Sequence, residues 1–281
     1  MKIIRSPQAM TRWSDGLRRK GLTIGFVPTM AALHDGHRAL IRAARSHCDA
    51  LVVSIFVNPI QFSPAEDLTK YPRPITRDRA LCRAEGVDVC FEPAARSMYP
   101  DDFQTVVSVP ELARRWEGEI RPHHFAGVAT VVTKLFGMVR PHGSWFGQKD
   151  FQQAALVRQL AQDLNLGVRI VVRPTVREPD GLAKSSRNVY LSQEERGIAP
   201  VLYAGLRSGA AAIRNGLRDG KRIRGLMASI VRRERAVTVD YLAVCDPVSL
   251  DPLAAVTGRT LLLGAIRLGG VRLIDNLVVA P

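Results

Sequence analysis

Cysteines are few in this sequence, and their spacing argues against two kinds of structural site. Four cysteines occur among 281 residues, and no two of them form a CxxC pair. Cys90 and Cys245 lie inside apolar runs that are typical of buried strands. The pattern therefore favours reduced, buried thiols over a disulfide framework or a zinc site.

The sequence also lacks a long apolar run. Its longest uncharged stretch, residues 50–65, has 16 residues and contains Asn58, Pro59, Gln61 and Pro64. This is short of the roughly 18 apolar residues that a membrane helix needs. The first residues, MKIIRSPQAMTRW, contain no apolar core of the kind found in signal peptides. We therefore expect a soluble, cytoplasmic protein with no membrane partner.

Acidic residues are scarce relative to basic ones. The chain has 40 Lys and Arg against 26 Asp and Glu, which gives a formal net charge of +14. A nucleic-acid-binding protein is one interpretation of this charge. The locally basic residues 214–235, however, include no aromatic side chain on which bases could stack. We favour the other interpretation, an arginine-rich surface around an enzyme with anionic substrates, and expect no nucleic-acid partner.

Over the first two thirds of the chain, short apolar runs alternate with amphipathic stretches. The clearest run, LVVSIFV at residues 51–57, is rich in β-branched residues and ends at Asn58-Pro59, as expected of a buried strand. The expected strands are residues 22–27, 51–57, 87–91, 144–147 and 168–172, and the expected helices are residues 36–47, 75–85, 125–139 and 150–165. This alternation predicts an α/β fold, a doubly wound, Rossmann-like parallel sheet with ligands at the carboxyl ends of its strands.

The last third of the chain has a different pattern. Ser192 followed three residues later by Glu195 forms a capping box, which predicts that a long helix starts there. A second helix is expected over residues 222–235, followed by strands at residues 238–244, 260–268 and 271–279. Two helices and an antiparallel sheet predict a smaller α+β domain. We therefore expect two domains, residues 1–175 and residues 176–281.

The segment FVPTMAALHDGHRALI, residues 26–41, carries the strongest chemical signal. His34 and His37 lie three residues apart at a predicted helix start, so they can face the same side. Free backbone N–H groups and the helix dipole favour an anion there. The pair would suit the α-phosphate of a nucleotide, where charge builds in the transition state. Two alternatives stay open, a pair of surface histidines at a helix cap and half of a metal site.

A second basic segment, VREPDGLAKSSRN at residues 176–188, places Lys184, Ser185, Ser186 and Arg187 in a row. Two cations and two hydroxyls could clamp a phosphate, since arginine binds phosphate oxygens in a bidentate way. The alternative is a solvated linker. Gly181 and the flanking prolines lead us to expect a mobile loop in the absence of a nucleotide. Together with the histidine pair, the segment supplies the second half of an adenylate-forming site.

The sequence resembles a known family, the pantothenate synthetases or pantoate–β-alanine ligases. The resemblance runs along almost the whole chain and is carried by the segments PTMAALHDGH (28–37), SIFVNPIQF (54–62), EDLTKYPR (66–73), RPHHFAGVATVVTKLF (121–136), FGQKDFQQ (146–153) and REPDGLAKSSRN (177–188). The family belongs to the nucleotidyltransferases that have a HIGH-like histidine motif and a KMSKS-like loop. The resemblance implies ATP-dependent condensation of (R)-pantoate with β-alanine through a pantoyl-adenylate, releasing pantothenate, AMP and pyrophosphate.

The resemblance also implies a role for each matching residue. The implied catalytic residues are His34, His37 and Lys149. The implied ATP-binding residues are Met30, Ala31, Ala32, Leu33, His34, Asp35, Gly36, His37, Gly147, Gln148, Lys149, Asp150, Val176, Lys184, Ser185, Ser186 and Arg187. Gln61 and Gln153 would bind pantoate, and Gln61 would also contact β-alanine. Mg²⁺ is expected to arrive with ATP, with no metal ligand assigned to the protein. The family resemblance further implies a homodimer.

Two residues depart from the family pattern. The family usually has glycine at the position of Ala31, and methionine or leucine at the position of Lys184. Lys184 would either strengthen phosphate binding or point to solvent. The region 66–102 is a candidate flap or dimer surface. Two other functions stay open, an adenylyltransferase that stops at nucleotide transfer and an RNA-binding module descended from a synthetase fold. Two glutamine sites beside the nucleotide segments favour the ligase.

Overall fold

The structure is a computed structural model that describes residues 1–63, 68–69 and 71–281. Three residues of the EDLTKYPR segment, Glu66, Asp67 and Lys70, lie outside the described residues, and so does part of the candidate flap at residues 66–102.

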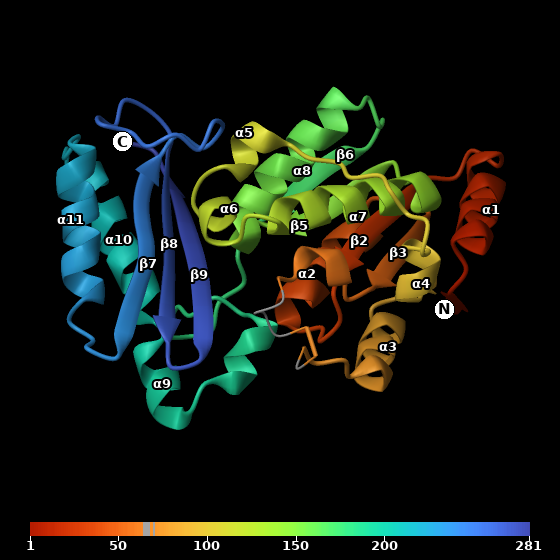
Figure 1. The fold of residues 1–281 in the computed structure, drawn as a ribbon, viewed down its shortest axis with the longest axis horizontal. Helices are drawn as coiled ribbons and strands as arrows, with labels where there is room; N and C mark the ends of the chain where they lie inside the picture. The colour runs from red at the N-terminus through yellow and green to blue at the C-terminus, as the bar shows by residue number, and fades with distance from the viewer. Residues whose placement is uncertain (64–67, 70) are drawn as a thin grey trace. The chain divides into compact units, whose positions relative to one another are not determined.

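The chain divides into two compact units, and each unit has its own sheet (Figure 1). Unit 1 comprises Met1–Gly147 and Gln152–Pro174, and unit 2 comprises Gln148–Phe151 and Thr175–Pro281.

Unit 1 contains a six-stranded sheet in the order β1-β4-β3-β2-β5-β6, and every neighbouring pair is parallel. The strands are β1 (Lys2–Ile4), β2 (Ile24–Thr29), β3 (Ala50–Ile55), β4 (Val89–Phe91), β5 (Gly143–Gly147) and β6 (Arg169–Arg173). From β2 the chain adds β3 and β4 on one side, and β5 and β6 later extend the other side. The switch point, where such sheets bind ligands, therefore lies between β2 and β5.

Helices cover both faces of this sheet. They are α1 (Pro7–Arg18), α2 (Asp35–Arg45), α3 (Ile75–Ala84), α4 (Ala95–Met98), α5 (Pro110–Ala113), α6 (Glu117–Ile120), α7 (His124–Val139) and α8 (Phe151–Asp163), with a 3₁₀ turn η1 (Pro59–Gln61). The sequence pattern predicted no helix or strand before residue 22. A local signal for α1 was present, because Ser6 caps the helix and Pro7 occupies its first position.

The strands of unit 1 are apolar on both faces because two cores flank the sheet. In β3, Val52 packs in a core with α1, α7 and α8. Leu51 and Val53 pack on the opposite face with α2 and α3. Continuous apolar runs are the expected sequence of such buried parallel strands, and the predicted doubly wound fold is confirmed. The four cysteines are free thiols, as predicted.

Unit 2 contains an antiparallel sheet in the order β7-β8-β9, which confirms the smaller α+β fold. Its elements are η2 (Gln148–Asp150), η3 (Ser186–Tyr190), α9 (Gln193–Ile198), α10 (Val201–Arg214), α11 (Gly220–Val231), β7 (Val237–Cys245), β8 (Thr260–Leu268) and β9 (Val271–Val279). Leu206 of α10, Met227 of α11 and Leu262 of β8 belong to one core. Within the described parts of the chain, no helix has the length and apolar character needed to span a membrane.

The prediction of a long helix from Ser192 is wrong. The capping box does form, because Ser192 Oγ accepts from Glu195 N and Glu195 Oε2 accepts from Ser192 N. However, α9 ends at Ile198 and a new helix begins only after Pro200. Proline has no N–H for the helix and its ring clashes with the preceding turn, so a continuous helix is interrupted there. The second predicted helix, 222–235, is α11 and ends four residues earlier, at Val231.

Candidate active site

The loop between β2 and α2 has an unusual backbone. Ala31 and Ala32 both have positive φ, at 72° and 52°. Non-glycine residues pay roughly 1–2 kcal/mol in this left-handed region, so something must hold them there. The left-handed conformation also explains why a relative with glycine at the position of Ala31 would adopt the same loop more easily.

A buried carboxylate from α3 holds this loop. Asp78 Oδ2 accepts from Ala32 N and Asp78 Oδ1 accepts from Leu33 N, both at 2.8 Å. Asp78 has no exposed surface. Burial raises the pKa of Asp78, while the hydrogen bonds from Leu33 and Ala32 oppose that rise. Asp78 was not among the predicted site residues, and it shapes the predicted nucleotide loop before any ligand is bound.

His34 and His37 cap α2 reciprocally. His34 Nδ1 accepts from Gly36 N at 3.1 Å, and His37 Nδ1 accepts from His34 N at 3.2 Å. The two ring centroids are 4.1 Å apart. Because each Nδ1 accepts a hydrogen bond, the neutral rings carry their protons on Nε2. The helix-cap interpretation is therefore confirmed, and the phosphate role of the two rings stays a prediction.

The amide of Gln61 is oriented by a chain of hydrogen bonds. Asn58 Nδ2 donates to Gln61 Oε1 at 3.0 Å, and Tyr99 Oη donates to Asn58 Oδ1 at 2.7 Å. Gln61 Nε2 in turn donates to Met30 Sδ. Gln61 is 4% exposed. The structure thus brings the predicted pantoate residue Gln61 together with Met30 of the predicted nucleotide loop, and it fixes Nε2 as the donating end of the amide.

The backbone of η1 is set by close packing against α7. A Cβ at Gly127 would lie 2.6 Å from Gln61 Cα and 2.6 Å from Ile60 O. His124 Nδ1 lies 3.0 Å from the carbonyl oxygen of Gln61. The HFAG part of the family segment 121–136 therefore has a structural reason, because only glycine allows α7 to approach η1 this closely.

The two adjacent glutamines of α8 have different surroundings. Gln152 is buried, donates to Leu112 O and Arg115 O at 2.8 Å each, and accepts from Glu117 N. Gln153, the predicted pantoate residue, is partly exposed. Gln152 thus ties α8 to the segment around α5 and α6, and the neighbouring Gln153 has the greater solvent access of the two.

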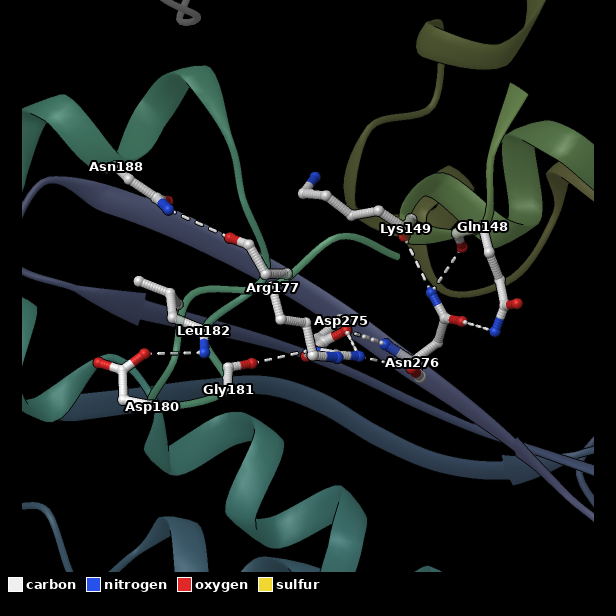
Figure 2. Close-up of polar contacts among 10 residues, drawn as sticks. Gln148, Lys149, Arg177, Asp180, Gly181, Leu182, Asn188, Asp275 and Asn276 are labelled. Carbon is white, nitrogen blue, oxygen red and sulfur yellow. Dashed lines mark hydrogen bonds and ion pairs between the residues drawn. The ribbon is translucent and has the colours of Figure 1, made fainter. Parts of the chain in front are cut away.

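In unit 2, Lys149 and Asp150 lie in η2. The Lys149 side chain is 18% exposed, and Nζ lies 3.5 Å from Asp150 Oδ1. The main-chain carbonyls of Gln148 and Lys149 both accept from Asn276 Nδ2 (Figure 2). The lysine side chain extends away from Asn276, so the same residue is held by its backbone while its ammonium group points elsewhere (Figure 2).

The segment 176–184 forms a small β-hairpin. Lys184 N donates to Val176 O at 2.9 Å and Glu178 N donates to Leu182 O at 2.8 Å. Leu182 and Ala183 are buried. The solvated-linker interpretation is therefore wrong, because a solvated linker would not bury apolar side chains or pair its backbone. Mobility of the segment without ATP stays a prediction.

Beyond the hairpin lies the predicted phosphate clamp. Lys184 Nζ lies 3.3 Å from Glu178 Oε1, so the lysine pairs across the hairpin rather than simply pointing to solvent. Ser185 caps η3 and accepts from Arg187 N at 3.3 Å. This turn places Ser186 and Arg187 at the start of η3. Among the described residues, no group of three or more His, Cys, Asp and Glu side chains could hold a metal ion.

The predicted site residues fall into two groups. Unit 1 contains residues 30–37, Gln61, Gly147 and Gln153. Unit 2 contains residues 148–150, Val176 and residues 184–187. Sequence reasoning missed Asp78, Asn58 and Tyr99 in the first group, and Arg177, Asp275 and Asn276 in the second.

Known proteins match the chain over its full length. A family model described as pantoate-beta-alanine ligase matches residues 2–278. The pantothenate synthetase of Heliobacterium modesticaldum is 49% identical over 99% of both chains. The crystal structure of pantothenate synthetase from Thermus thermophilus has a TM-score of 0.95 and 44% identity, covering 100% of both chains.

A further solved structure carries ligands. The pantoate-beta-alanine ligase from Francisella tularensis, complexed with beta-gamma ATP and beta-alanine, has a TM-score of 0.82 and 35% identity over 99% of this chain and 97% of its own. Sequence, fold and full-length coverage therefore agree, and the chain is an enzyme that belongs to the pantoate-β-alanine ligase family.

Proposed function

We propose that the chain joins pantoate to β-alanine in two chemical steps. In the first, a carboxylate oxygen of pantoate attacks the α-phosphorus of ATP and pyrophosphate leaves. In the second, the amine of β-alanine attacks the acyl carbon of the pantoyl-adenylate, loses a proton, and AMP leaves with the bonding electron pair. The observation that carries this proposal is the reciprocal cap of His34 and His37, because it holds both imidazole rings at an anion-favouring helix start.

In this proposal, His34 and His37 stabilise charge on the transferred phosphate. The negative charge of the α-phosphate oxygens increases as the pentacoordinate transition state forms, and preorganised donors lower its energy. The role of the Nδ1 atoms is different, since they hold the rings in place by accepting backbone hydrogen bonds. Asp78 contributes indirectly, because it holds the loop from which the rings project.

Other residues of the two groups bind ATP in this proposal. Residues 30–37 and Gly147 do so from unit 1. The ATP-binding residues of unit 2 are Gln148, Val176 and residues 184–187. In the same unit, Lys149 contacts the phosphates or the reacting carboxylate, and Asp150 binds the ribose hydroxyls. Arg187 and its serine neighbours bind phosphate oxygens. Mg²⁺ enters as part of the MgATP substrate.

Pantoate binding is assigned to the two glutamines. Because Asn58 occupies Gln61 Oε1, the Nε2 group of Gln61 is the end that donates to a pantoate oxygen. Gln153 supplies a second amide. Met30 and Phe62 offer apolar surface for the geminal methyl groups of pantoate, and β-alanine is placed beside Gln61. We further propose a cytoplasmic homodimer in which residues 1–175 form the nucleotide- and pantoate-binding domain and residues 176–281 the lid domain.

AMP release tests this function against the adenylyltransferase alternative. Purified protein with MgATP should release AMP in steady state only when pantoate and β-alanine are both present. Omitting either substrate is the matched control, since each omission blocks one of the two steps. Steady AMP release that needs neither acid nor amine, or pyrophosphate release without AMP in the complete mixture, would contradict the proposed reaction.

A further inference from the structure

Two adjacent polar residues are buried in the strand β9. Asp275 is 5% exposed and Asn276 is 1% exposed. Buried polar side chains are costly unless their hydrogen bonds are satisfied. Neighbouring residues of a strand point to opposite faces, so these two side chains can hold two different segments at once. Neither was among the predicted site residues.

Asn276 holds the backbone of η2. Its Nδ2 donates to Gln148 O at 2.8 Å and to Lys149 O at 2.9 Å, and its Oδ1 accepts from Gln148 Nε2 at 3.3 Å (Figure 2). Both donor hydrogens of the amide are thereby used. Aspartate has the same shape but no donor, so it would place a carboxylate against two carbonyl oxygens. The requirement at this position is therefore specific for an amide.

Asp275 holds the base of the hairpin 176–184. Arg177 Nη1 and Nη2 donate to its two carboxylate oxygens at 2.5 and 2.9 Å (Figure 2). Arg177 Nη1 also donates to Gly181 O at 3.0 Å, and the guanidinium stacks 3.8 Å from the ring centroid of Tyr203. A bidentate pair with a stacked guanidinium has one well-defined geometry. The hairpin is thereby anchored to Asp275, the residue next to the Asn276 that anchors η2.

The electrostatics of this pair match an anchoring role. Burial raises the pKa of Asp275, while the hydrogen bonds and the charge of Arg177 oppose that rise. Asp275 Oδ1 also accepts from Asn276 N at 2.8 Å, which links the two anchors directly. Loss of either partner would leave a buried charge uncompensated, which is why such pairs rarely tolerate the removal of one member.

We propose that Asp275 and Asn276 are positioning residues, a clamp on β9 that holds η2 and the hairpin 176–184 in one register. The clamp sets the position of Lys149 relative to the turn of residues 184–187, so that the lysine and the turn contact the phosphates of one ATP. The inference rests on the proposed function in one respect, namely that Lys149 and residues 184–187 bind ATP. Asp275 and Asn276 themselves touch no substrate and act through these groups.

The test is Asn276→Asp, which preserves the shape of the side chain. We expect the KM for ATP to rise by about 10-fold, the range of one or two lost buried hydrogen bonds, with the KM for β-alanine changed by less than about 2-fold. Arg272→Met is the matched control, because Arg272 lies on the same strand but pairs with Asp240. Its KM for ATP should equal that of the unmodified protein, and thermal unfolding should show that all variants are folded.

A double-mutant cycle with Lys149→Ala separates positioning from general destabilisation. If Asn276 acts through Lys149, the double variant should have about the same KM for ATP as Lys149→Ala alone. The reason is that the effects of substitutions at interacting residues do not add. The clamp would be overturned if the effects of the two substitutions on the KM for ATP were fully additive. It would also be overturned if a folded Asn276→Asp variant had an unchanged KM for ATP. If Lys149→Ala itself leaves the KM for ATP and turnover unchanged, the proposed role of Lys149 is wrong instead.

Tyr203→Leu keeps the test decisive if Asn276→Asp does not fold. This change removes the ring on which the Arg177 guanidinium stacks, and Tyr203 is not among the proposed ATP-binding residues. We expect a rise of about 2- to 3-fold in the KM for ATP, since one cation–π contact is lost. An unchanged KM in this variant would count against the clamp.

Discussion

Single residues of the site use different atoms for structure and for chemistry. The two imidazoles accept backbone hydrogen bonds at Nδ1, and Lys149 is held by its carbonyl oxygen. Gln61 accepts at Oε1 and donates at Nε2. Groups whose orientation is already fixed lose less entropy when a substrate binds. This division therefore favours a preorganised site. It also implies that substitutions that change the donor or acceptor atoms of a side chain impair the site more than substitutions that change only its size.

Among the proposed ATP-binding residues 184–187, Lys184 is expected to contribute least to the affinity for ATP. Its Nζ lies 3.3 Å from Glu178 Oε1, and an ion pair of this kind on a partly exposed hairpin is worth about 0–1 kcal/mol. We predict that Lys184→Met changes the KM for ATP by less than about 3-fold, whereas Arg187→Ala raises it far more. Both variants should be assayed at one fixed Mg²⁺ concentration. A Lys184→Met variant as impaired as Arg187→Ala would show that the lysine contributes as much to phosphate binding as the arginine.

Residue pairs far apart in the sequence were beyond prediction. Asp78 meets Ala32 and Leu33 across 45 to 46 positions, and Asp275 meets Arg177 across 98. No local pattern specifies such a contact, since any of the acidic residues could in principle fill the role. His34, His37, Gln61 and Lys149 were predicted as site residues because they lie in segments that resemble a family, or at a helix start with a recognisable anion-binding pattern.

Elements were predicted where their periodicity was strong. The strands at residues 24–29 and 50–55 are mostly apolar on both faces, as expected of strands flanked by two cores. The errors arose from single residues that override a local signal. The capping box at Ser192 starts a helix, and Pro200 prevents this helix from continuing into α10. The short strand β1 was missed because three residues carry too little pattern, and it forms only by pairing with β4.

The contact of α7 with η1 gives a prediction at the scale of elements. A Cβ on Gly127 would lie 2.6 Å from the backbone of Ile60 and Gln61, closer than real Cβ contacts allow. We predict that Gly127→Ala displaces η1, lowers stability by about 1–3 kcal/mol and raises the KM for pantoate more than that for ATP. Calorimetry and steady-state kinetics measure the two effects.

Gly137 provides the control on the same helix. A Cβ there would meet nothing within 4 Å, so Gly137→Ala should stabilise the protein by about 0.5–1 kcal/mol through helix propensity alone. Equal effects of the two substitutions would show that η1 is not held by close packing against α7.

For the whole molecule, the partly buried ion-pair network around Glu92 predicts acid sensitivity. Burial on its own would raise the pKa of Glu92, but hydrogen bonds from Arg79 and Cys90 and the charges of Arg79 and Arg5 lower it below 4.5 overall. A depressed carboxyl pKa contributes stability above the unfolded pKa, and this contribution is lost as pH falls through the folded pKa.

Arg79→Met isolates that contribution. The variant should unfold at a lower temperature than the unmodified protein at pH 7, because Glu92 loses its bidentate partner. The difference should narrow as the pH falls through the depressed pKa of Glu92 in the unmodified protein, because the carboxyl group that pairs with Arg79 then becomes protonated. Thermal unfolding between pH 3 and pH 7 measures this, and a difference that stays constant across the range would contradict the role of the pair.

The charge of +14 gives a second prediction for the whole molecule. We expect tRNA and random DNA to bind only weakly and with strong salt dependence, as for non-specific phosphate contacts. A filter-binding titration at several salt concentrations measures this. Retention that survives about 0.2 M salt would instead support the RNA-binding interpretation.

The most direct test of the account is pyrophosphate exchange in the absence of β-alanine. If a pantoyl-adenylate forms, labelled pyrophosphate should enter ATP only when pantoate is present. His37→Ala should slow this exchange by roughly 10²–10³ while circular dichroism shows an intact fold, because one preorganised transition-state donor is lost. No pantoate-dependent exchange in a protein that makes pantothenate, or near-normal exchange in a folded His37→Ala variant, would contradict the account.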